Sequence, residues 1–104
     1  VLTNLVENAC KYAPSNSTVR IALTCDSADA TVQVHDNGPG IPREKMPHIF
    51  AAFYQVDRGT RSPGMGLGLY ISQEIIRALG GDIWAESKEG VGSIFSFRLP
   101  RLSE

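Results

Sequence analysis

A glycine-rich segment is the first part of this chain whose residues could do chemistry. Gly64, Gly66 and Gly68 alternate and run directly into the apolar segment Leu69–Ser72. Glycine lets the backbone approach a ligand closely, and the first N–H groups of a helix have no partner inside the helix. Because the helix dipole makes that end positive, the segment predicts an anion site, most often one for phosphate. If this segment is considered alone, a flexible loop explains its glycines equally well.

A carboxylate followed by two glycines is the second such feature. Asp36 comes directly after the strand-like run Thr31–His35, and Gly38 and Gly40 follow it. This order places a hydrogen-bond acceptor at the rim of a sheet, with bare backbone beside it. Asp, Asn, Gly and Pro are also the usual residues of a surface turn, so this motif alone does not distinguish a site from a turn.

Two amides in a predicted helix are the third feature. Residues 1–13 are expected to form an amphipathic helix that Pro14 ends, with the apolar stripe Val1, Leu2, Leu5, Val6 and Ala9. Asn4, Asn8 and Lys11 recur at i, i+4 and i+7 and therefore share another face, with Tyr12 beside them. A solvated polar face is the alternative interpretation of these four residues.

The elements that must position these groups follow from the hydrophobic periods. Alternating or clustered β-formers predict four strands, joined in pairs by polar or glycine-rich turns, at residues 19–24, 31–36, 82–87 and 93–99. A short helix is expected at 43–53, with Phe50 and Phe53 as apolar anchors. The strongest helix is expected at 67–79, with the stripe Leu67, Ile71, Ile75, Ile76 and Leu79, and Gly80-Gly81 as its stop.

The loop Tyr54–Pro63 lies between these two predicted helices. Its position directly before the glycine-rich segment suits a lid, and its arginines, Arg58 and Arg61, could reach a bound phosphate. Arginines in a loop are more often simply solvated. Together the elements predict an α+β fold, a two-layer sandwich with a mixed, mostly antiparallel sheet and the helices packed on one face.

The composition of the chain limits the number of domains and the classes of partner that can be expected. The chain has 104 residues, 42% of them hydrophobic, and a net charge of −1, so one globular domain at 1–104 is expected, with no general attraction to nucleic acid or anionic lipid. No apolar run is long enough to cross a membrane. Cys10 and Cys25 match no metal-binding spacing and are expected to be reduced packing residues, which fits a cytosolic compartment.

The order of these motifs is far more specific than any one of them. It resembles the catalytic and ATP-binding domain of sensor histidine kinases, within the group that includes gyrase, Hsp90 and MutL, over essentially the whole chain. Four segments carry the resemblance to that family's N, G1, F and G2 boxes, in that order: Asn4–Tyr12, Asp36–Gly40, Ile49–Tyr54 and Gly64–Leu69. The closing strands also follow the family pattern.

The resemblance implies roles for individual residues. Asn8 would hold the Mg²⁺ that bridges the ATP phosphates, Asn4 would lie beside them, and Lys11 would add a positive charge. Asp36 would accept a hydrogen bond from the adenine amino group. The remaining residues implied in nucleotide binding are Tyr12, Gly38, Gly40, Ile41, Phe53, Arg58, Gly64, Gly66, Leu67, Gly68 and Leu69.

The resemblance also implies the reaction. Hydrolysing relatives usually carry at the position of Asn4 a glutamate that activates water, and an amide cannot act as a general base. Glu7, on the same helix, is an uncertain substitute. The expected activity is therefore transfer of the ATP γ-phosphoryl group to a histidine on a separate dimerisation domain, with a response regulator as a further partner. A nucleotide-binding interaction module without phosphotransfer is the alternative, and a hydrolysing ATPase is disfavoured.

Departures from the family pattern set limits on this interpretation. Gln55 stands where arginine is common, and Met65 where threonine is frequent. His35 and His48 are expected to be structural or solvated, because neither lies in a long helix with an acidic residue after it. The family's opening strand and first helix are expected to be missing, which would weaken nucleotide binding and favour self-association through an uncovered sheet edge. The domain is expected to be cytoplasmic, in the cytosolic part of a membrane-bound sensor.

Overall fold

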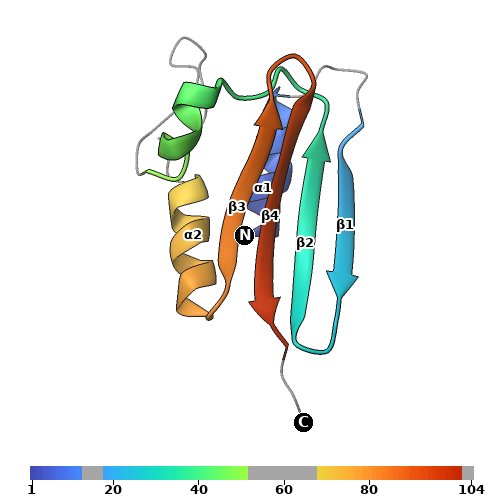
Figure 1. Ribbon diagram of the computed structural model, residues 1–104, viewed down its shortest axis with the longest axis vertical. Coiled ribbons are helices and arrows are strands. Elements are labelled where there is room, and N and C mark those ends of the chain that lie inside the picture. Colours follow the sequence, from blue (N-terminus) through green and yellow to red (C-terminus); the bar gives the residue numbers. More distant parts are fainter. Residues whose placement is uncertain (13–17, 52–67, 102–104) are drawn as a thin grey trace.

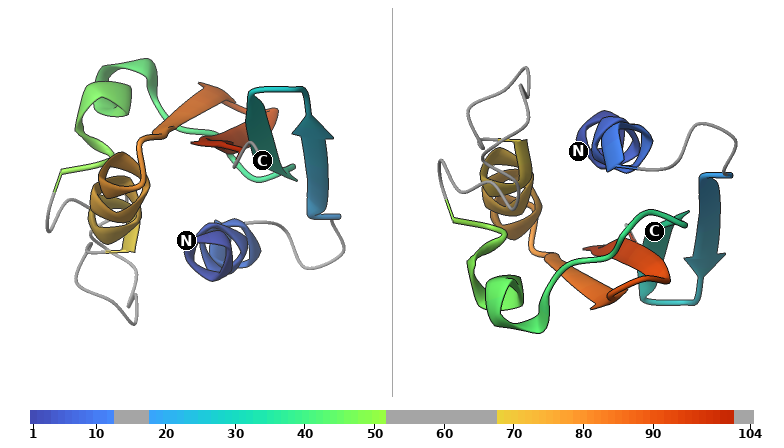
Figure 2. Two further views of the ribbon diagram at one scale, coloured as in Figure 1. Left: turned by 90° about the horizontal axis from the view of Figure 1, so that it is seen from below. Right: turned by 90° about the horizontal axis from the view of Figure 1, so that it is seen from above.

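The protein, as a computed structural model, forms one sheet with helices on one of its faces (Figures 1 and 2). The structure describes residues 1–12, 18–51 and 68–101. Its elements are α1 (Leu2–Tyr12), β1 (Arg20–Cys25), β2 (Asp29–Asp36), the 3₁₀ helix η1 (Arg43–His48), α2 (Gly68–Ala78), β3 (Asp82–Lys88) and β4 (Gly92–Pro100). The α+β two-layer fold expected from the sequence is confirmed. None of the described helices is both long and apolar enough to span a membrane.

The sheet has four strands in the order β1-β2-β4-β3. The hairpins β1–β2 and β3–β4 join through β2 and β4, and all three pairings are antiparallel. Among the described residues the sheet therefore contains no parallel pair, whereas the sequence had suggested a mixed one. The reason is that β4, the second strand of its hairpin, lies inside the sheet and runs opposite to β2.

The core lies between the sheet and the two α-helices. Val34 and Phe95 are opposite each other on β2 and β4, and both are buried on the face that the helices cover. α1 contributes Leu5 and α2 contributes Ile76, each only 1% exposed. Burying such a side chain contributes roughly 1.5–3 kcal/mol. The core therefore holds α1 and α2 against the same sheet face, which is what brings their polar residues together.

The apolar stripe expected on α2 is only partly buried. Ile76 is buried as predicted, but Ile71, Ile75 and Leu79 are 44%, 42% and 58% exposed. The buried face of α2 contains Ser72 and Ile76, which share a side of the helix at a spacing of four. The prediction was wrong for these three residues because the apolar residues of α2 extend around more of the helix than its contacts with β3 and α1 cover.

The helix expected at 43–53 is shorter and of a different type. A 3₁₀ helix spans Arg43–His48 and contains Pro47. Proline lacks the N–H that an α-helix would bond to the carbonyl four residues earlier, so a continuous α-helix is unfavourable here. Ile49, just after it, is buried, and Phe50 packs partly buried against the core. Ile49, rather than Phe50, is therefore the deeper anchor, and Phe53 lies outside the described residues.

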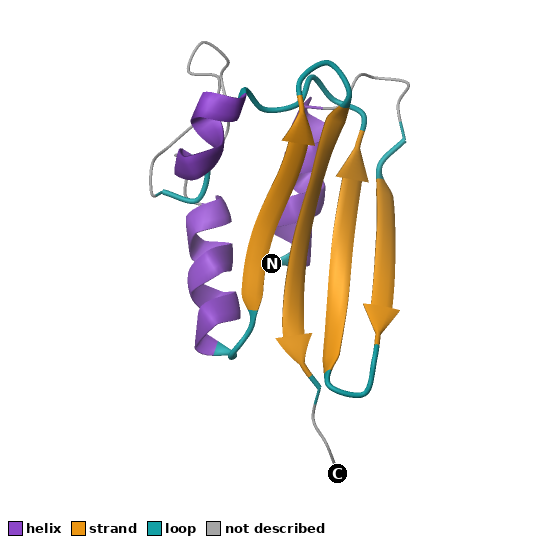
Figure 3. Ribbon diagram, in the orientation of Figure 1, coloured by secondary structure: helices purple, strands orange, loops and turns teal. Residues whose placement is uncertain are grey.

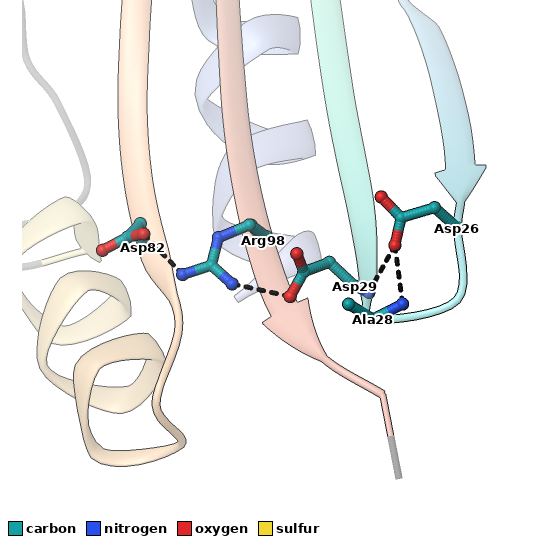
Figure 4. A network of polar contacts seen from close by, with 5 residues as sticks. All are labelled: Asp26, Ala28, Asp29, Asp82 and Arg98. Atoms are coloured by element: carbon teal, nitrogen blue, oxygen red, sulfur yellow. Dashed lines mark hydrogen bonds and ion pairs between the residues drawn. The ribbon is translucent and has the colours of Figure 1, made fainter. Parts of the chain in front are cut away.

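A polar network closes the sheet at the end away from η1, on the face without α-helices (Figure 4). Arg98 on β4 donates to Asp29 at 2.7 Å and to Asp82 at 2.6 Å, bridging β2 and β3. These bonds raise the pKa of Arg98. In the adjacent turn, backbone N–H groups of Asp29 and Ala28 donate to the Asp26 carboxylate and lower its pKa. The turn is therefore stabilised by a charged carboxylate at neutral pH.

Candidate functional site

Asp36 is the last residue of β2 and lies on the helix-covered face, two positions after Val34. It is 8% exposed. Its Oδ1 accepts a hydrogen bond from the backbone N–H of Gly38 at 2.9 Å. No other hydrogen bond from a described residue reaches this carboxylate. One oxygen thus fixes the side chain, and the other is left to accept a bond from a ligand.

The loop after Asp36 is fastened to the β3–β4 hairpin, and both lie at the same end of the sheet (Figure 3). The backbone N–H of Ile41 donates to Ser87 Oγ at 2.7 Å, and the backbone N–H of Gly90 donates to the Pro39 carbonyl at 2.8 Å. Ser87 in turn donates to the Gly92 carbonyl. Sequence reasoning missed Ser87, because a serine in a strand carries no pattern that identifies a partner 46 residues away.

Two glycines are required by these backbone contacts. Gly40 has a φ of +76°, and a Cβ there would lie 2.4 Å from the Lys88 carbonyl oxygen. A Cβ on Gly92, which has a φ of +148°, would lie 2.1 Å from the Asp36 carbonyl oxygen. Backbone packing therefore requires glycine at position 40, whether or not a ligand binds there. Gly38 is buried and donates the bond that orients Asp36.

The first turns of α1 and α2 are joined by Asn4. Its Nδ2 donates to Ser72 Oγ at 3.2 Å and lies 3.5 Å from the Gly68 carbonyl oxygen. Ser72 is fully buried. Asn4 therefore holds the N-terminus of α2, the end whose free N–H groups favour an anion. Ser72 was also missed from the sequence, although a serine four residues before Ile76, on the same helix face, is a usable signal.

We expect Asn4 and Ser72 to be energetically coupled. Ser72→Ala removes the acceptor, and Asn4→Ala removes the donor. In a double-mutant cycle on the free energy of unfolding, the coupling should be about 1 kcal/mol, a typical net value for such a bond. Urea unfolding of the four proteins measures it. Thr3→Ala, an exposed neighbour on α1, serves as the control and should be additive with Ser72→Ala. Additivity of the Asn4 and Ser72 changes would contradict the contact.

Asn8 lies one turn after Asn4 on the same face of α1 and is half-buried. No described residue forms a hydrogen bond with its side chain. A single amide oxygen suits Mg²⁺, which usually keeps several waters and takes its other ligands from substrate phosphates. Among the described residues there is no cluster of three or more His, Cys, Asp or Glu side chains that could hold a metal. The amide oxygen of Asn8 could therefore be one ligand of a metal whose other ligands come from a nucleotide.

The described residues contain part of the predicted set. Gly68 and Leu69 form the first turn of α2, and Leu69 also packs against the core. Ile41 is half-buried beside the core. The side chains of Lys11 and Tyr12 lie outside the description, as do the lid at 54–63 and the predicted site residues Phe53, Arg58, Gly64, Gly66 and Leu67.

A hollow of about 480 Å³ lies on the other face of the sheet. Its lining includes the row Arg20, His35, Ile94 and Glu86, which crosses the four strands on the face opposite the α-helices. His35 is bonded there to Gln33 and lies 3.5 Å from Arg20. Asp36, Ser87 and Gly92 also line this hollow, whereas Asn4 and Asn8 do not. The hollow therefore adjoins the candidate site at the ends of β2, β3 and β4 but does not reach α1.

Comparisons with known proteins agree with this arrangement. The family model for histidine kinase-, DNA gyrase B- and HSP90-like ATPases matches residues 1–103. The chain is 40% identical over 108 residues to sensor histidine kinase WalK of Bacillus subtilis (strain 168), covering 100% of this chain and 18% of WalK. A nucleotide-free catalytic domain of histidine kinase ThkA has a TM-score of 0.81 and 36% identity, covering 95% of this chain and 63% of that one. Full-length ShkA in complex with AMPPNP has a TM-score of 0.83 and 31% identity, covering 95% of this chain and 20% of ShkA. The chain thus spans about a fifth of the length of WalK and of ShkA.

Proposed function

Because the chain belongs to the family of histidine kinase-, DNA gyrase B- and HSP90-like ATPases, we propose that it is the ATP-binding catalytic lobe of a two-component sensor histidine kinase. The observation that carries this proposal is the buried Asp36 carboxylate, held at one oxygen by Gly38. The free oxygen would accept a hydrogen bond from the adenine amino group. Likeness to ShkA, solved with AMPPNP, supports a nucleotide as the ligand.

The phosphates would lie between α1 and the first turn of α2. Gly68 and Leu69 would direct backbone N–H groups at them, and the Asn4 bonds to Ser72 and Gly68 hold that turn in place. Asn8 would hold Mg²⁺, which when bound neutralises phosphate charge. Gly40 and Ile41 would complete the site, together with Lys11 and Tyr12 at the end of α1 and with Phe53 and Arg58, which lie outside the described residues.

The activity we propose is transfer of the γ-phosphoryl group to a histidine on a dimerisation and phosphotransfer domain of the same protein. Asn4 supports transfer over hydrolysis, because an amide cannot remove a proton from water. Glu7, the other acidic candidate on α1, is exposed. Positioning and charge neutralisation supply most of the catalysis in phosphoryl transfer, so no base is required of this domain. A response regulator and a cytoplasmic location, in the cytosolic part of a membrane-bound sensor, belong to the same proposal.

Supplying the dimerisation domain of the same protein in trans tests the proposal. With Mg·ATP labelled at the γ-position, we expect label to appear on that domain as acid-labile, base-stable phosphohistidine. A matched sample in which the acceptor histidine is replaced by glutamine should stay unlabelled. ATP binding without labelled acceptor would instead identify a nucleotide-binding interaction module. Steady phosphate release without the acceptor would identify a hydrolysing ATPase.

A further inference from the structure

The last row of side chains on the helix-covered face of the sheet is polar. Ser87 of β3 lies opposite Ser93 of β4, and Ser93 lies opposite Asp36 of β2. The preceding row on this face is apolar and consists of Ala85, Phe95 and Val34. Ser93 is 6% exposed and Asp36 is 8% exposed. Buried polar groups are almost always hydrogen-bonded, so the contacts of this row show which segments it holds together.

Ser87 uses all of its hydrogen-bonding capacity within the protein. Its Oγ accepts a hydrogen bond from the backbone N–H of Ile41 at 2.7 Å and donates one to the Gly92 carbonyl at 3.1 Å. Ser93 Oγ lies 2.8 Å from the same atom. A hydroxyl has one proton and two lone pairs, so Ser93 must be the donor of this third bond. Ser87 therefore has no group left for a ligand, and it can act on a ligand only through its neighbours.

The bond to Ile41 ties the loop 37–41 to the β3–β4 hairpin, at one end of the sheet (Figure 3). The other ties of this loop to the hairpin use backbone atoms alone. They are the Pro39 carbonyl, which accepts an N–H from the tip of the hairpin, and Gly40, which packs directly on hairpin backbone. Among the described residues, Ser87 is thus the one side chain whose hydrogen bond fastens this loop to the hairpin. It is therefore the position where a substitution can loosen the loop without a change in the loop itself.

We infer that Ser87 is a positioning residue for the base-binding part of the nucleotide site, an inference that rests on the proposed function. The loop 37–41 begins directly after Asp36, which we propose reads adenine, and its last residue, Ile41, belongs to the same proposed site. Ser87 fixes Ile41 through one bond. Through another it fixes Ser93, the residue opposite Asp36. The loop that follows Asp36 and the residue across the sheet from it thus both depend on one hydroxyl.

The phosphate part of the proposed site is held by other bonds. There Asn4 fastens the first turn of α2 through Ser72 and Gly68. These bonds include no atom of the β3–β4 hairpin. Loss of the Ser87 hydroxyl should therefore weaken binding of the nucleotide and leave the chemistry at its γ-phosphate unchanged.

Autophosphorylation by the full-length protein that contains this domain tests the role of Ser87. In Ser87→Ala the Ile41 N–H and the Gly92 carbonyl lose their partner, and the loop must move to satisfy them. We expect KM for ATP to rise about tenfold, the effect of roughly one hydrogen bond, while kcat stays within about twofold. Calorimetric titration with Mg·ATP should show the same loss of affinity.

Conservative variants separate the hydroxyl from the size of the side chain. Ser87→Thr keeps the hydroxyl on a residue type that suits a strand, so it should return KM to within about threefold of the parent value. Ser87→Cys keeps the shape but has a weaker donor and acceptor, and it should give an intermediate KM. A general loss of packing at this position would not produce that order. If Ser87→Ala did not fold, the comparison of the cysteine and threonine variants would decide in the same way.

Arg98→Ala is the control for stability. It breaks the bridge from β4 to Asp29 and Asp82 at the opposite end of the sheet, so it destabilises the same strands without touching the loop 37–41. Its KM for ATP should equal that of the parent protein, and circular dichroism at the assay temperature verifies that each variant is folded. An equal rise of KM in Arg98→Ala would contradict the inference, because it would reduce the effect of Ser87 to general stability.

Three further results would overturn the inference. The first is a folded Ser87→Ala variant with the KM and ATP affinity of the parent protein. The second is a Ser87→Thr variant as impaired as Ser87→Ala, which would show that the hydroxyl is not the group that matters. The third is a fall in kcat at constant KM, which would place the effect at the phosphates. Failure of the proposed function is distinct, because the parent protein itself would then bind no ATP or label no histidine.

Discussion

Replacing Asp36 with asparagine should lower the affinity for Mg·ATP by at least about 100-fold, which corresponds to about 2.7 kcal/mol. The new amide oxygen can still accept the Gly38 N–H, so the side chain keeps its position. The group that then faces the ligand is an NH₂, and it meets the adenine amino group donor to donor. Calorimetric titration of the parent chain and the variant measures the loss.

Base preference makes this prediction specific. Inosine triphosphate carries an oxygen where adenine carries its amino group, so Asp36→Asn should narrow or reverse the preference for ATP over inosine triphosphate. Asp29→Asn is the matched control, because Asp29 lies on the same strand but bonds Arg98 at the other end of the sheet. Its nucleotide affinity should be unchanged. An unaltered ATP affinity in Asp36→Asn would refute the adenine assignment.

The Gly92→Ala variant should lose about 3 kcal/mol or more of unfolding free energy, a large share of the total for a small domain. The new Cβ would lie 2.1 Å from the Asp36 carbonyl oxygen, and backbone on paired strands cannot yield as a flexible side chain can. The strands β2 and β4 must separate at the residue that we propose reads adenine. ATP affinity should therefore fall even in the folded fraction.

Gly90→Ala separates this clash from backbone strain. Gly90 also has a positive φ, +79°, but a Cβ there would meet nothing within 4 Å. The expected cost is about 1 kcal/mol, from the unfavourable dihedral alone. Denaturant unfolding compares the two variants. Equal losses of stability would show that the approach of Gly92 to Asp36 contributes nothing.

Local signals in the sequence were sufficient for the strands and the two α-helices, but not for residues 43–53, where the structure has a 3₁₀ helix over Arg43–His48. The β1–β2 hairpin was predicted from β-formers around residues 26–29, and Asp26 indeed bonds the backbone of Ala28 and Asp29 there. The errors about burial arose where tertiary contacts determine which side chains are covered. Ile71 and Ile75 fit a helical stripe, yet the contacts of α2 with the rest of the fold leave both substantially exposed.

The candidate site was predictable to the extent that motif order identifies it. Asp36 was selected with the glycines that follow it and Asn4 with Asn8 on the same helix face, and both lie where elements meet. The serines that hold this site together by hydrogen bonds were not predicted, because Ser72 is 68 residues from Asn4 and Ser87 is 46 residues from Ile41. A hydroxyl group has no periodicity, so only the packed fold reveals such partners.

These long separations have a consequence for folding. The hairpins β1–β2 and β3–β4 join residues close in sequence, whereas the Asn4–Ser72 bond joins residues that are 68 positions apart. Contacts between distant residues carry a larger loop-closure entropy and form slowly. During synthesis, α1 emerges before α2 and the last hairpin, and the proposed pocket cannot exist until they have followed. We therefore expect nucleotide binding to begin only when folding is complete, so that the ligand stabilises finished molecules and no earlier state.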